Sequence, residues 1–184
     1  MIGMENNFHN IPKELKEQPN WVNWISPKRN GKSTKIPVNP KTGGFAKSND
    51  PSTWATFDEA SSRYESDHVA GVGFVFTSSP FCGIDLDHCR DSETGVIKAW
   101  AKKIMRNVKT YAEVSPSGTG VHLICKGELP PGGRNSGRVE MYDTGRYFTV
   151  TGQHVEGTPL LISDAQKEIE NLHKCIFTEE EVTP

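Results

Sequence analysis

Apolar runs of strand length alternate with turn residues along most of the chain. The segment 21–25 (WVNWI) is rich in aromatic and branched side chains, which is typical of a β-strand. The runs 69–76 and 81–86 are also apolar, and the short Thr/Ser/Pro turn between them predicts a β-hairpin. Further short strands are predicted at 35–38, 111–114, 121–125, 138–142 and 147–150. Because proline cannot donate a ladder hydrogen bond, Pro37 favours a sheet edge for its strand.

Helical patterns are fewer than strand patterns. Between residues 93 and 108, apolar side chains recur near the spacing of one helix face, which predicts a helix that ends before the next strand. Helices are also predicted at 12–18, 53–64 and 164–174. The order mixes hairpins with helices and does not repeat a strand–helix–strand unit. The expected fold class is therefore α+β, with a largely antiparallel sheet.

Length and charge narrow the class of protein. The 184 residues suffice for one domain, or for one domain with a small appendage. The net charge of −2 gives no global positive field, so binding of nucleic acid would depend on a local basic groove. The N-terminus has no basic segment followed by an apolar run, and no apolar stretch approaches the ~20 residues of a membrane span. We therefore expect a cytoplasmic protein with no membrane partner.

The cysteines do not form a closely spaced pair of the kind that binds zinc. They are Cys82, Cys89, Cys125 and Cys175. We predict that all of them are free thiols.

Two aspartates stand at the end of the apolar run 81–86. Asp85 and Asp87 are two residues apart, so both carboxylates point to one face of a strand. Ile84 and Leu86 then point to the other face. Adjacent carboxylates repel each other, and a divalent cation that prefers hard oxygen ligands, such as Mg²⁺ or Mn²⁺, neutralises such a pair. Aspartates are also common where a strand ends in a turn, so this pattern alone leaves a structural role open.

A turn rich in small residues, SPSGTG at 115–120, precedes the strand predicted at 121–125. Its glycines let the backbone approach a ligand and present N–H groups to phosphate oxygens. His122 points away from the apolar row of Val121 and Leu123, where it would meet the triphosphate of a nucleotide. The turn lacks the Gly-Lys-Ser/Thr ending of a P-loop, and no predicted helix follows it. A plain hairpin turn is the alternative.

A third carboxylate lies on the strand predicted at 138–142 (RVEMY). Val139 and Met141 are expected to face the core. Glu140 and Arg138 then share the opposite face. A carboxylate on a neighbouring strand would complete the ligands of a two-metal phosphoryl-transfer site. Alone, Glu140 also fits an exposed strand residue, so the prediction depends on all three strands together.

These motifs, in this order, resemble those of the archaeo-eukaryotic primase superfamily. The matching segments are CGIDLD at 82–87, SPSGTGVH at 115–122 and VEMYDTGRYFTVTG at 139–152. The similarity is closer to the primase-polymerase domains at the N-termini of phage and plasmid replication proteins. It extends to the earlier segments WVNW, KIPVNPKTGG and DPSTW, and so spans about residues 20–155.

The resemblance implies an RRM-like, mostly antiparallel catalytic sheet with flanking helices, beside an N-terminal α/β module. It implies template-directed nucleotide transfer with Mg²⁺ or Mn²⁺, as a DNA primase and polymerase in the replication of a phage or mobile element. The implied partners are a single-stranded DNA template and primer, a dNTP or NTP, and a helicase or helical domain in the full-length protein.

The resemblance also assigns roles to residues. The implied metal ligands are Asp85, Asp87 and Glu140, and His122 completes the catalytic set as a contact to nucleotide phosphate. The implied lining of the nucleotide pocket is Ser115, Ser117 and Gly118, with further nucleotide or sugar contacts from Lys35, Arg146 and Tyr147. Template contacts are expected from Lys28, Arg29, Lys32 and Trp54, for which a solvated loop is the alternative.

Two other functions remain open. A metal-dependent nuclease would use the same carboxylates on a phosphodiester, and a nucleotide- or single-strand-binding replication-initiation module would have little activity alone. The expected boundaries are a polar segment at 1–19, the catalytic domain at 20–160, and a C-terminal helix and tail at 161–184 that starts a linker to further domains. Because members of the superfamily continue into a helical domain, we expect this chain to extend primers but to initiate them poorly by itself.

Overall fold

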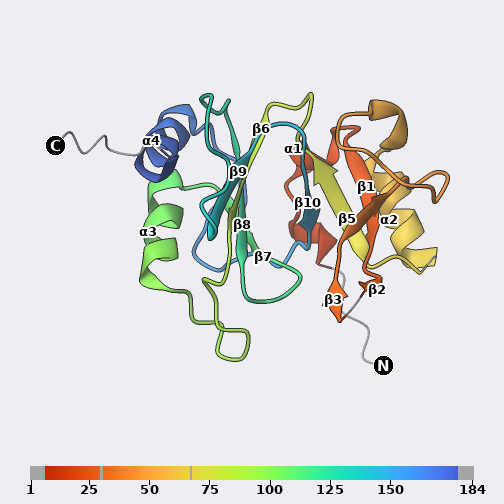
Figure 1. The fold of residues 1–184 in the computed structure, drawn as a ribbon, viewed down its shortest axis with the longest axis horizontal. Helices are drawn as coiled ribbons and strands as arrows, with labels where there is room; N and C mark the ends of the chain where they lie inside the picture. Colours follow the sequence, from red (N-terminus) through yellow and green to blue (C-terminus); the bar gives the residue numbers. More distant parts are fainter. Residues whose placement is uncertain (1–6, 30, 67, 178–184) are drawn as a thin grey trace. The chain divides into compact units, whose positions relative to one another are not determined.

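The computed structural model describes residues 7–29, 31–66 and 68–177, and the chain forms two compact units (Figure 1). The first unit comprises Met1–Ser79 and Thr144–Gln153, and the second comprises Pro80–Asp143 and His154–Pro184. The chain passes between the units three times, so neither unit is one continuous segment. The boundaries predicted at 19/20 and 160/161 concern the extent of the catalytic region and stay predictions.

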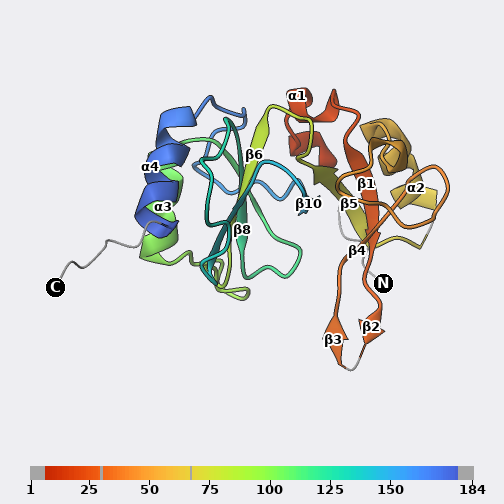
Figure 2. The same cartoon turned by 45° about the horizontal axis from the view of Figure 1, so that its top comes forward.

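The first unit is built on a four-stranded antiparallel sheet in the order β10-β5-β1-β4. Its strands are β1 (Trp21–Ile25), β4 (Ile36–Val38), β5 (Gly71–Val75) and β10 (Tyr147–Val150). A separate hairpin is formed by β2 (Lys28–Arg29) and β3 (Lys32–Ser33) (Figure 2). The helical segments are η1 (Phe8–Asn10), α1 (Lys13–Lys16), η2 (Pro51–Thr53) and α2 (Phe57–Ser66). The edge position predicted for the strand with Pro37 is confirmed.

Aromatic side chains fill the core of the first unit. Trp21 makes edge-on contacts with Phe57 and Phe74, at ring-centroid distances of 4.8 and 5.4 Å. Helix α2 thereby packs on β1 and β5. The helix begins later than predicted, because a capping box fixes its start: the Glu59 carboxylate accepts from the backbone N–H of Thr56, and the Thr56 hydroxyl accepts from that of Glu59.

The second unit contains a four-stranded antiparallel sheet in the order β7-β8-β6-β9. Its elements are β6 (Phe81–Leu86), α3 (Ala99–Val108), β7 (Tyr111–Val114), β8 (Val121–Lys126), β9 (Val139–Tyr142) and α4 (Gln166–Phe177). Helices α3 and α4 contact each other and cover one face of this sheet (Figure 1). That face carries the apolar row of each strand, and Ile84, Leu123 and Met141 are fully buried there.

The hairpin predicted from residues 69–76 and 81–86 is wrong. β5 pairs with β1 and β10 in one sheet, whereas β6 pairs with β8 and β9 in the other. Both runs are apolar because both are interior strands of their own sheets, each with a neighbour on either side. The four residues between them carry the chain from one unit to the next.

The remaining elements agree with the predicted types, with shifted ends. Helix α3 begins at Ala99 because residues 90–97 form a turn, in which the Asp91 carboxylate accepts from the backbone N–H groups of Glu93 and Thr94. The predicted α+β class is confirmed, with two four-stranded antiparallel sheets and four α-helices in the described residues. All four cysteines are free thiols, as predicted. No helix in the described ranges has the length and apolar character needed to cross a membrane.

Candidate functional site

The predicted acidic and histidine side chains come together on one face of the second unit's sheet. In the pairing of β6 with its two neighbours, Asp85 lies opposite His122 on β8 and opposite Glu140 on β9. Their apolar neighbours along each strand belong to the core under α3 and α4. Since side chains alternate between the faces of a strand, the polar residues lie on the face away from those helices. The predicted orientation of these three residues is confirmed.

His122 is the centre of this polar row. Its side chain is only 5% exposed, and its Nε2 atom lies 3.7 Å from Oδ1 of Asp85. On the other side of the ring, Nδ1 lies 3.8 Å from Oε1 of Glu113. The imidazole therefore stands between two carboxylates, one on each neighbouring strand.

Glu113 and Tyr111 are site residues that the sequence reasoning missed. Both lie on β7 and are fully buried, and the Tyr111 hydroxyl donates a hydrogen bond of 2.9 Å to Oε2 of Glu113. Burial, and then the adjacent carboxylate, raise the pKa of Tyr111 far above its ordinary value, so this hydroxyl keeps its proton. The signal was present in the segment YAEV, where Tyr111 and Glu113 alternate with the apolar Ala112 and Val114.

Asp87 and Glu140 occupy the rim of the site. Asp87 follows directly after β6, is half-buried, and donates its backbone N–H to the carbonyl of Arg138. Glu140 is also half-buried, and its Oε1 accepts a hydrogen bond of 2.8 Å from the side-chain amide of Asn135. Arg138 does not share a face with Glu140 as predicted, because its guanidinium lies over the ring of Trp100 on α3.

The donor chemistry of Asp85, Asp87 and Glu140 suits a hard divalent cation, because all three side chains offer carboxylate oxygens. Asp85 and Glu140 are direct partners in the ladder, and Asp87 follows Asp85 by two residues. In the part of the chain that the structure describes, no three or more His, Cys, Asp or Glu side chains form a group that would hold a metal ion. The assignment of these residues as metal ligands stays a prediction.

The turn at 115–120 joins β7 to β8 as a tight hairpin. The backbone N–H of Ser115 donates to the carbonyl of Gly120, and that of Gly118 donates to the carbonyl of Ser115. The hydroxyl of the buried Ser115 accepts from the N–H of Gly120 and lies 3.0 Å from the hydroxyl of the exposed Ser117. Gly118 has a φ of +76°, a left-handed conformation that glycine adopts at little cost. The three predicted pocket residues thus belong to one ordered turn.

Arg90 holds this turn in place through hydrogen bonds, and the sequence did not predict this role. Its Nη1 atom donates a 2.8 Å hydrogen bond to the carbonyl of Gly118, and its backbone N–H donates to the carbonyl of Thr119. Arg90 follows Asp87 by three residues in the chain. The short segment after β6 therefore contributes both to the acidic rim and to the position of the turn.

Three of the predicted nucleotide contacts belong to the first unit. The hydroxyl of Tyr147 donates a 2.9 Å hydrogen bond to the backbone carbonyl of Lys35, and burial raises the pKa of Tyr147 above its ordinary value. The Lys35 ammonium lies 6.0 Å from the centroid of the Trp24 ring. Arg146 is exposed, and its carbonyl accepts from the N–H of Phe76. Lys35 and Tyr147 are thus brought together, and their proposed roles stay predictions.

The predicted template contacts have mixed outcomes. Trp54 is only 4% exposed, packs in the core of the first unit, and donates its indole N–H to the carbonyl of Lys47. Its ring is therefore not available for stacking on a base, and that prediction is wrong. Lys28 is exposed on the β2–β3 hairpin. The side chains of Arg29 and Lys32 lie outside the described part of the structure.

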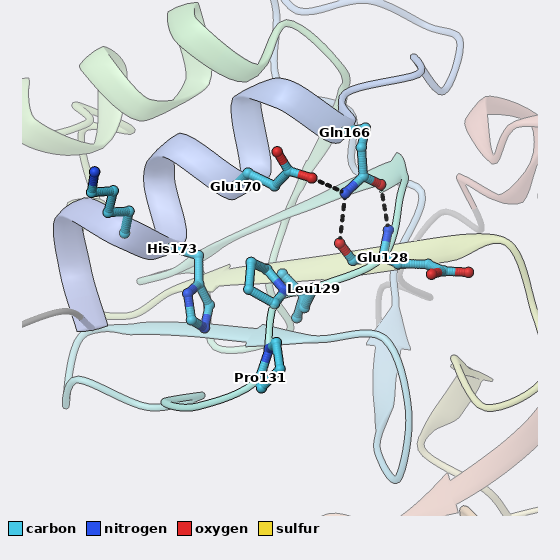
Figure 3. Close-up of a pocket in the computed structure, with 8 residues that line it drawn as sticks. Glu128, Leu129, Pro131, Gln166, Glu170 and His173 are labelled. Carbon is cyan, nitrogen blue, oxygen red and sulfur yellow. Dashed lines mark hydrogen bonds between the residues drawn. The ribbon is translucent and has the colours of Figure 1, made fainter.

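A separate pocket of about 640 Å³ lies beside α4 in the second unit (Figure 3). The side-chain amide of Gln166 holds one wall, since it accepts from the N–H of Glu128 and donates to the Glu128 carbonyl. His173 forms another wall, with Nε2 at 2.9 Å from the carbonyl of Gly133. None of the predicted site residues lines this pocket. Its polar groups bond mainly to one another and to backbone, which is consistent with a role in fastening α4 to the neighbouring loops.

Comparison with known proteins shows that the chain is similar to part of a longer phage protein. Over 152 aligned residues, the chain is 38% identical to a protein of Nitratiruptor phage NrS-1. That protein is a DNA primase-polymerase. The match covers 79% of this chain and 21% of the phage primase-polymerase, so the chain spans about a fifth of the length of its relative. No protein-family model matches the chain. The similarity relates the chain to one part of that phage protein, and placement in the archaeo-eukaryotic primase superfamily stays a prediction.

Proposed function

We propose that this chain is a nucleotidyltransferase domain that adds nucleotides to a DNA primer on a template. The observation that carries the proposal is the register of β6, which places Asp85 opposite both His122 and Glu140 on adjacent strands. An acid–histidine–acid row on the face away from the helices suits a phosphate substrate with a divalent cation. The 38% identity to a phage DNA primase-polymerase supports the same reaction class.

Asp85, Asp87 and Glu140 would hold Mg²⁺ or Mn²⁺ through their carboxylate oxygens. When bound, such ions supply charge neutralisation at the transferring phosphate and activate the primer hydroxyl. The three carboxylates come from β6, from the residue just after it, and from β9. Because strand positions are fixed by ladder hydrogen bonds, the donors are placed before substrate arrives, as electrostatic preorganisation requires.

The triphosphate would lie along the turn at 115–120 and against His122. Nε2 of His122 is the ring atom on the Asp85 side, and it would contact a phosphate oxygen beside the acidic row. The turn would add hydroxyl groups from Ser115 and Ser117 and the backbone of Gly118. Lys35, Arg146 and Tyr147 are proposed as further nucleotide contacts on the strength of the family resemblance.

The proposed partners are a single-stranded DNA template, a primer, and a dNTP or NTP. A helicase or helical domain is proposed for the full-length protein, because the phage relative is about five times as long as the aligned part. An RRM-like arrangement of the catalytic sheet, a two-metal mechanism and a phage or mobile-element context belong to the same proposal.

Primer extension tests the proposal. The chain is incubated with Mn²⁺, a labelled primed template and dNTPs, and the primer length is read on a gel. Lengthening supports the polymerase, shortening indicates the metal-dependent nuclease, and an unchanged primer that is nonetheless bound indicates a binding module. The matched control is Asp164→Asn, which alters an exposed carboxylate of the same unit and leaves extension unchanged, whereas Asp85→Asn abolishes it.

A further inference from the structure

A buried carboxylate stands behind the proposed catalytic histidine and has no role in the function described above. Glu113 is fully buried on β7, and in the β7–β8 ladder it lies directly opposite His122. Its Oε2 accepts the hydroxyl hydrogen of Tyr111 at 2.9 Å, and its Oε1 lies 3.8 Å from Nδ1 of His122. Glu113 therefore contacts the proposed site through the imidazole ring.

A buried carboxylate in this position is unfavourable for folding, so its presence points to a role other than stability. Removing a charge from water is costly, and even a buried pair of opposite charges is often no better than well-packed apolar side chains. The other face of β7 carries Ala112, which packs in the core with α3 and α4. A neutral acceptor such as glutamine would also satisfy the buried Tyr111 hydroxyl, so that hydrogen bond alone does not account for a carboxylate here.

The geometry of His122 suggests that purpose. The two ring nitrogens face different carboxylates: Nδ1 faces Glu113, and Nε2 faces Asp85. A carboxylate close to one ring nitrogen of a histidine favours the tautomer that carries the proton on that nitrogen, because the N–H dipole and the negative charge attract each other. The protonated Tyr111 hydroxyl holds the Glu113 carboxylate in turn, and the Tyr111 ring stacks on His154 at a centroid distance of 5.8 Å.

We propose that Glu113, held by Tyr111, is the positioning residue for His122. Glu113 keeps Nδ1 directed toward β7 and Nε2 directed toward β6, the side on which the nucleotide triphosphate would bind. This inference rests on the proposed nucleotidyl transfer.

Steady-state primer extension with Glu113→Gln tests the role. The amide is nearly isosteric and still accepts the Tyr111 hydrogen bond, but it carries no charge. We expect the KM for dNTP to rise about tenfold, the typical loss when a partner behind a functional histidine is removed, while the KM for primer stays unchanged. Tyr111→Phe removes the donor to Glu113 and leaves the carboxylate in place, and we expect a smaller rise in the same constant.

The control is Thr110→Val at the start of the same strand. It removes a buried hydroxyl that donates to the carbonyl of Ile124 and does not touch His122. This variant should lose stability and keep the wild-type KM for dNTP. A positioning role also predicts that Glu113→Gln changes the KM for dNTP by less than twofold when His122 is already replaced by alanine.

A second readout separates this inference from the proposed function. The ¹⁵N signals of the His122 ring report its tautomer in the protein without nucleotide, and we expect them to change in Glu113→Gln but not in Thr110→Val. An inactive wild-type chain would overturn the proposed function, and the ring signals would still test the positioning. Unchanged ring signals, an unchanged KM for dNTP, or equal effects of Glu113→Gln with and without His122 would each overturn the positioning role.

Discussion

Both sheets of this protein bury polar side chains, but they use them differently. In the first unit the buried polar groups on β1 and just before it are amides. Asn23 donates to the carbonyls of Ala60 and Gly71, and Asn20 donates to those of Val75 and Thr77. Each amide joins backbone segments that are distant in the chain. These residues act as internal fasteners, and their neutral groups need no charged partner.

In the second unit, ionisable side chains contact one another across strands. Glu113, His122 and Asp85 form a row over β7, β8 and β6, at distances of 3.7 to 3.8 Å between carboxylate oxygens and ring nitrogens. Ionisable groups are more expensive to bury than amides. The comparison separates neutral side chains that bond to backbone from titratable side chains that contact each other, and the second arrangement is the one for which we propose a catalytic role.

The largest expected effect belongs to the acidic pair. In Asp85→Ala with Asp87→Ala, metal-dependent primer extension should fall by at least about 1,000-fold, which corresponds to about 4 kcal/mol of transition-state stabilisation. Removal of two neighbouring negative charges should leave the melting temperature without metal unchanged or higher. Extension rates and thermal unfolding measure the two quantities. Activity that survives the double replacement would refute the metal assignment.

The corresponding change in the first unit should affect stability. Asn23→Ala removes two buried hydrogen bonds and leaves a small cavity, so we expect a loss of about 2–3 kcal/mol in the free energy of unfolding. Urea denaturation followed by tryptophan fluorescence measures the loss, because Trp21 and Trp24 lie on the same strand. Asn171→Ala, at an exposed helical position, is the control and should change stability by less than about 0.5 kcal/mol. A loss of unfolding free energy no larger than that of the control would show that the Asn23 hydrogen bonds do not stabilise the first unit.

A smaller effect is expected at the anchor of the glycine turn. Arg90→Ala removes the 2.8 Å hydrogen bond to the Gly118 carbonyl, and a bond from a charged donor contributes about 1.5–3 kcal/mol. The KM for dNTP should therefore rise roughly tenfold or more, with an unchanged KM for primer. Arg106→Ala, on the exposed side of α3, provides the matched loss of a guanidinium. An equal KM for dNTP in the two variants would contradict the role of Arg90 in holding the turn for nucleotide binding.

The smallest effect is expected at Gly118. Its φ of +76° makes an alanine strained by about 1–2 kcal/mol, although a Cβ would meet nothing closer than the Ser92 side chain at 3.6 Å. The melting temperature of Gly118→Ala should fall by a few degrees. Gly44→Ala, where φ is not positive, serves as the control and should cost less. An equal cost at both positions would indicate that the turn relaxes to another conformation.

Much of the site was predictable because strand alternation is a local property. Side chains alternate between the two faces along a strand. The positions of Asp85, His122 and Glu140 relative to the apolar residues of their own segments therefore decide which face each occupies, and no knowledge of the neighbouring strands is needed. Their direct opposition was not derivable, because it depends on the register between strands whose paired residues are 37 (85 to 122) and 55 (85 to 140) positions apart in the chain. Glu113 was missed because its place opposite His122 depends on the register that the turn at 115–120 imposes. Only the β7–β8 ladder shows that it stands behind His122.

The wrong hairpin has a related cause. The runs 69–76 and 81–86 are near neighbours in sequence and have the composition and the turn of a hairpin. An apolar composition indicates that both faces of a strand are buried, as they are for β5 and β6. It does not indicate which strand each of them pairs with. The prediction for Trp54 was wrong for a different reason. An aromatic ring suits both base stacking and a hydrophobic core, and the hydrogen bond from its indole N–H to the carbonyl of Lys47, which holds the ring in the core, is a tertiary contact.

The proposed reaction can be tested by a crystal structure of the chain soaked with Mn²⁺ and a dNTP, read by the anomalous scattering of manganese. We expect manganese density bonded to the carboxylates of Asp85, Asp87 and Glu140. The triphosphate should lie between the turn at 115–120 and Nε2 of His122. Manganese at another place, or nucleotide bound away from the β6–β8–β9 face, would contradict the proposal.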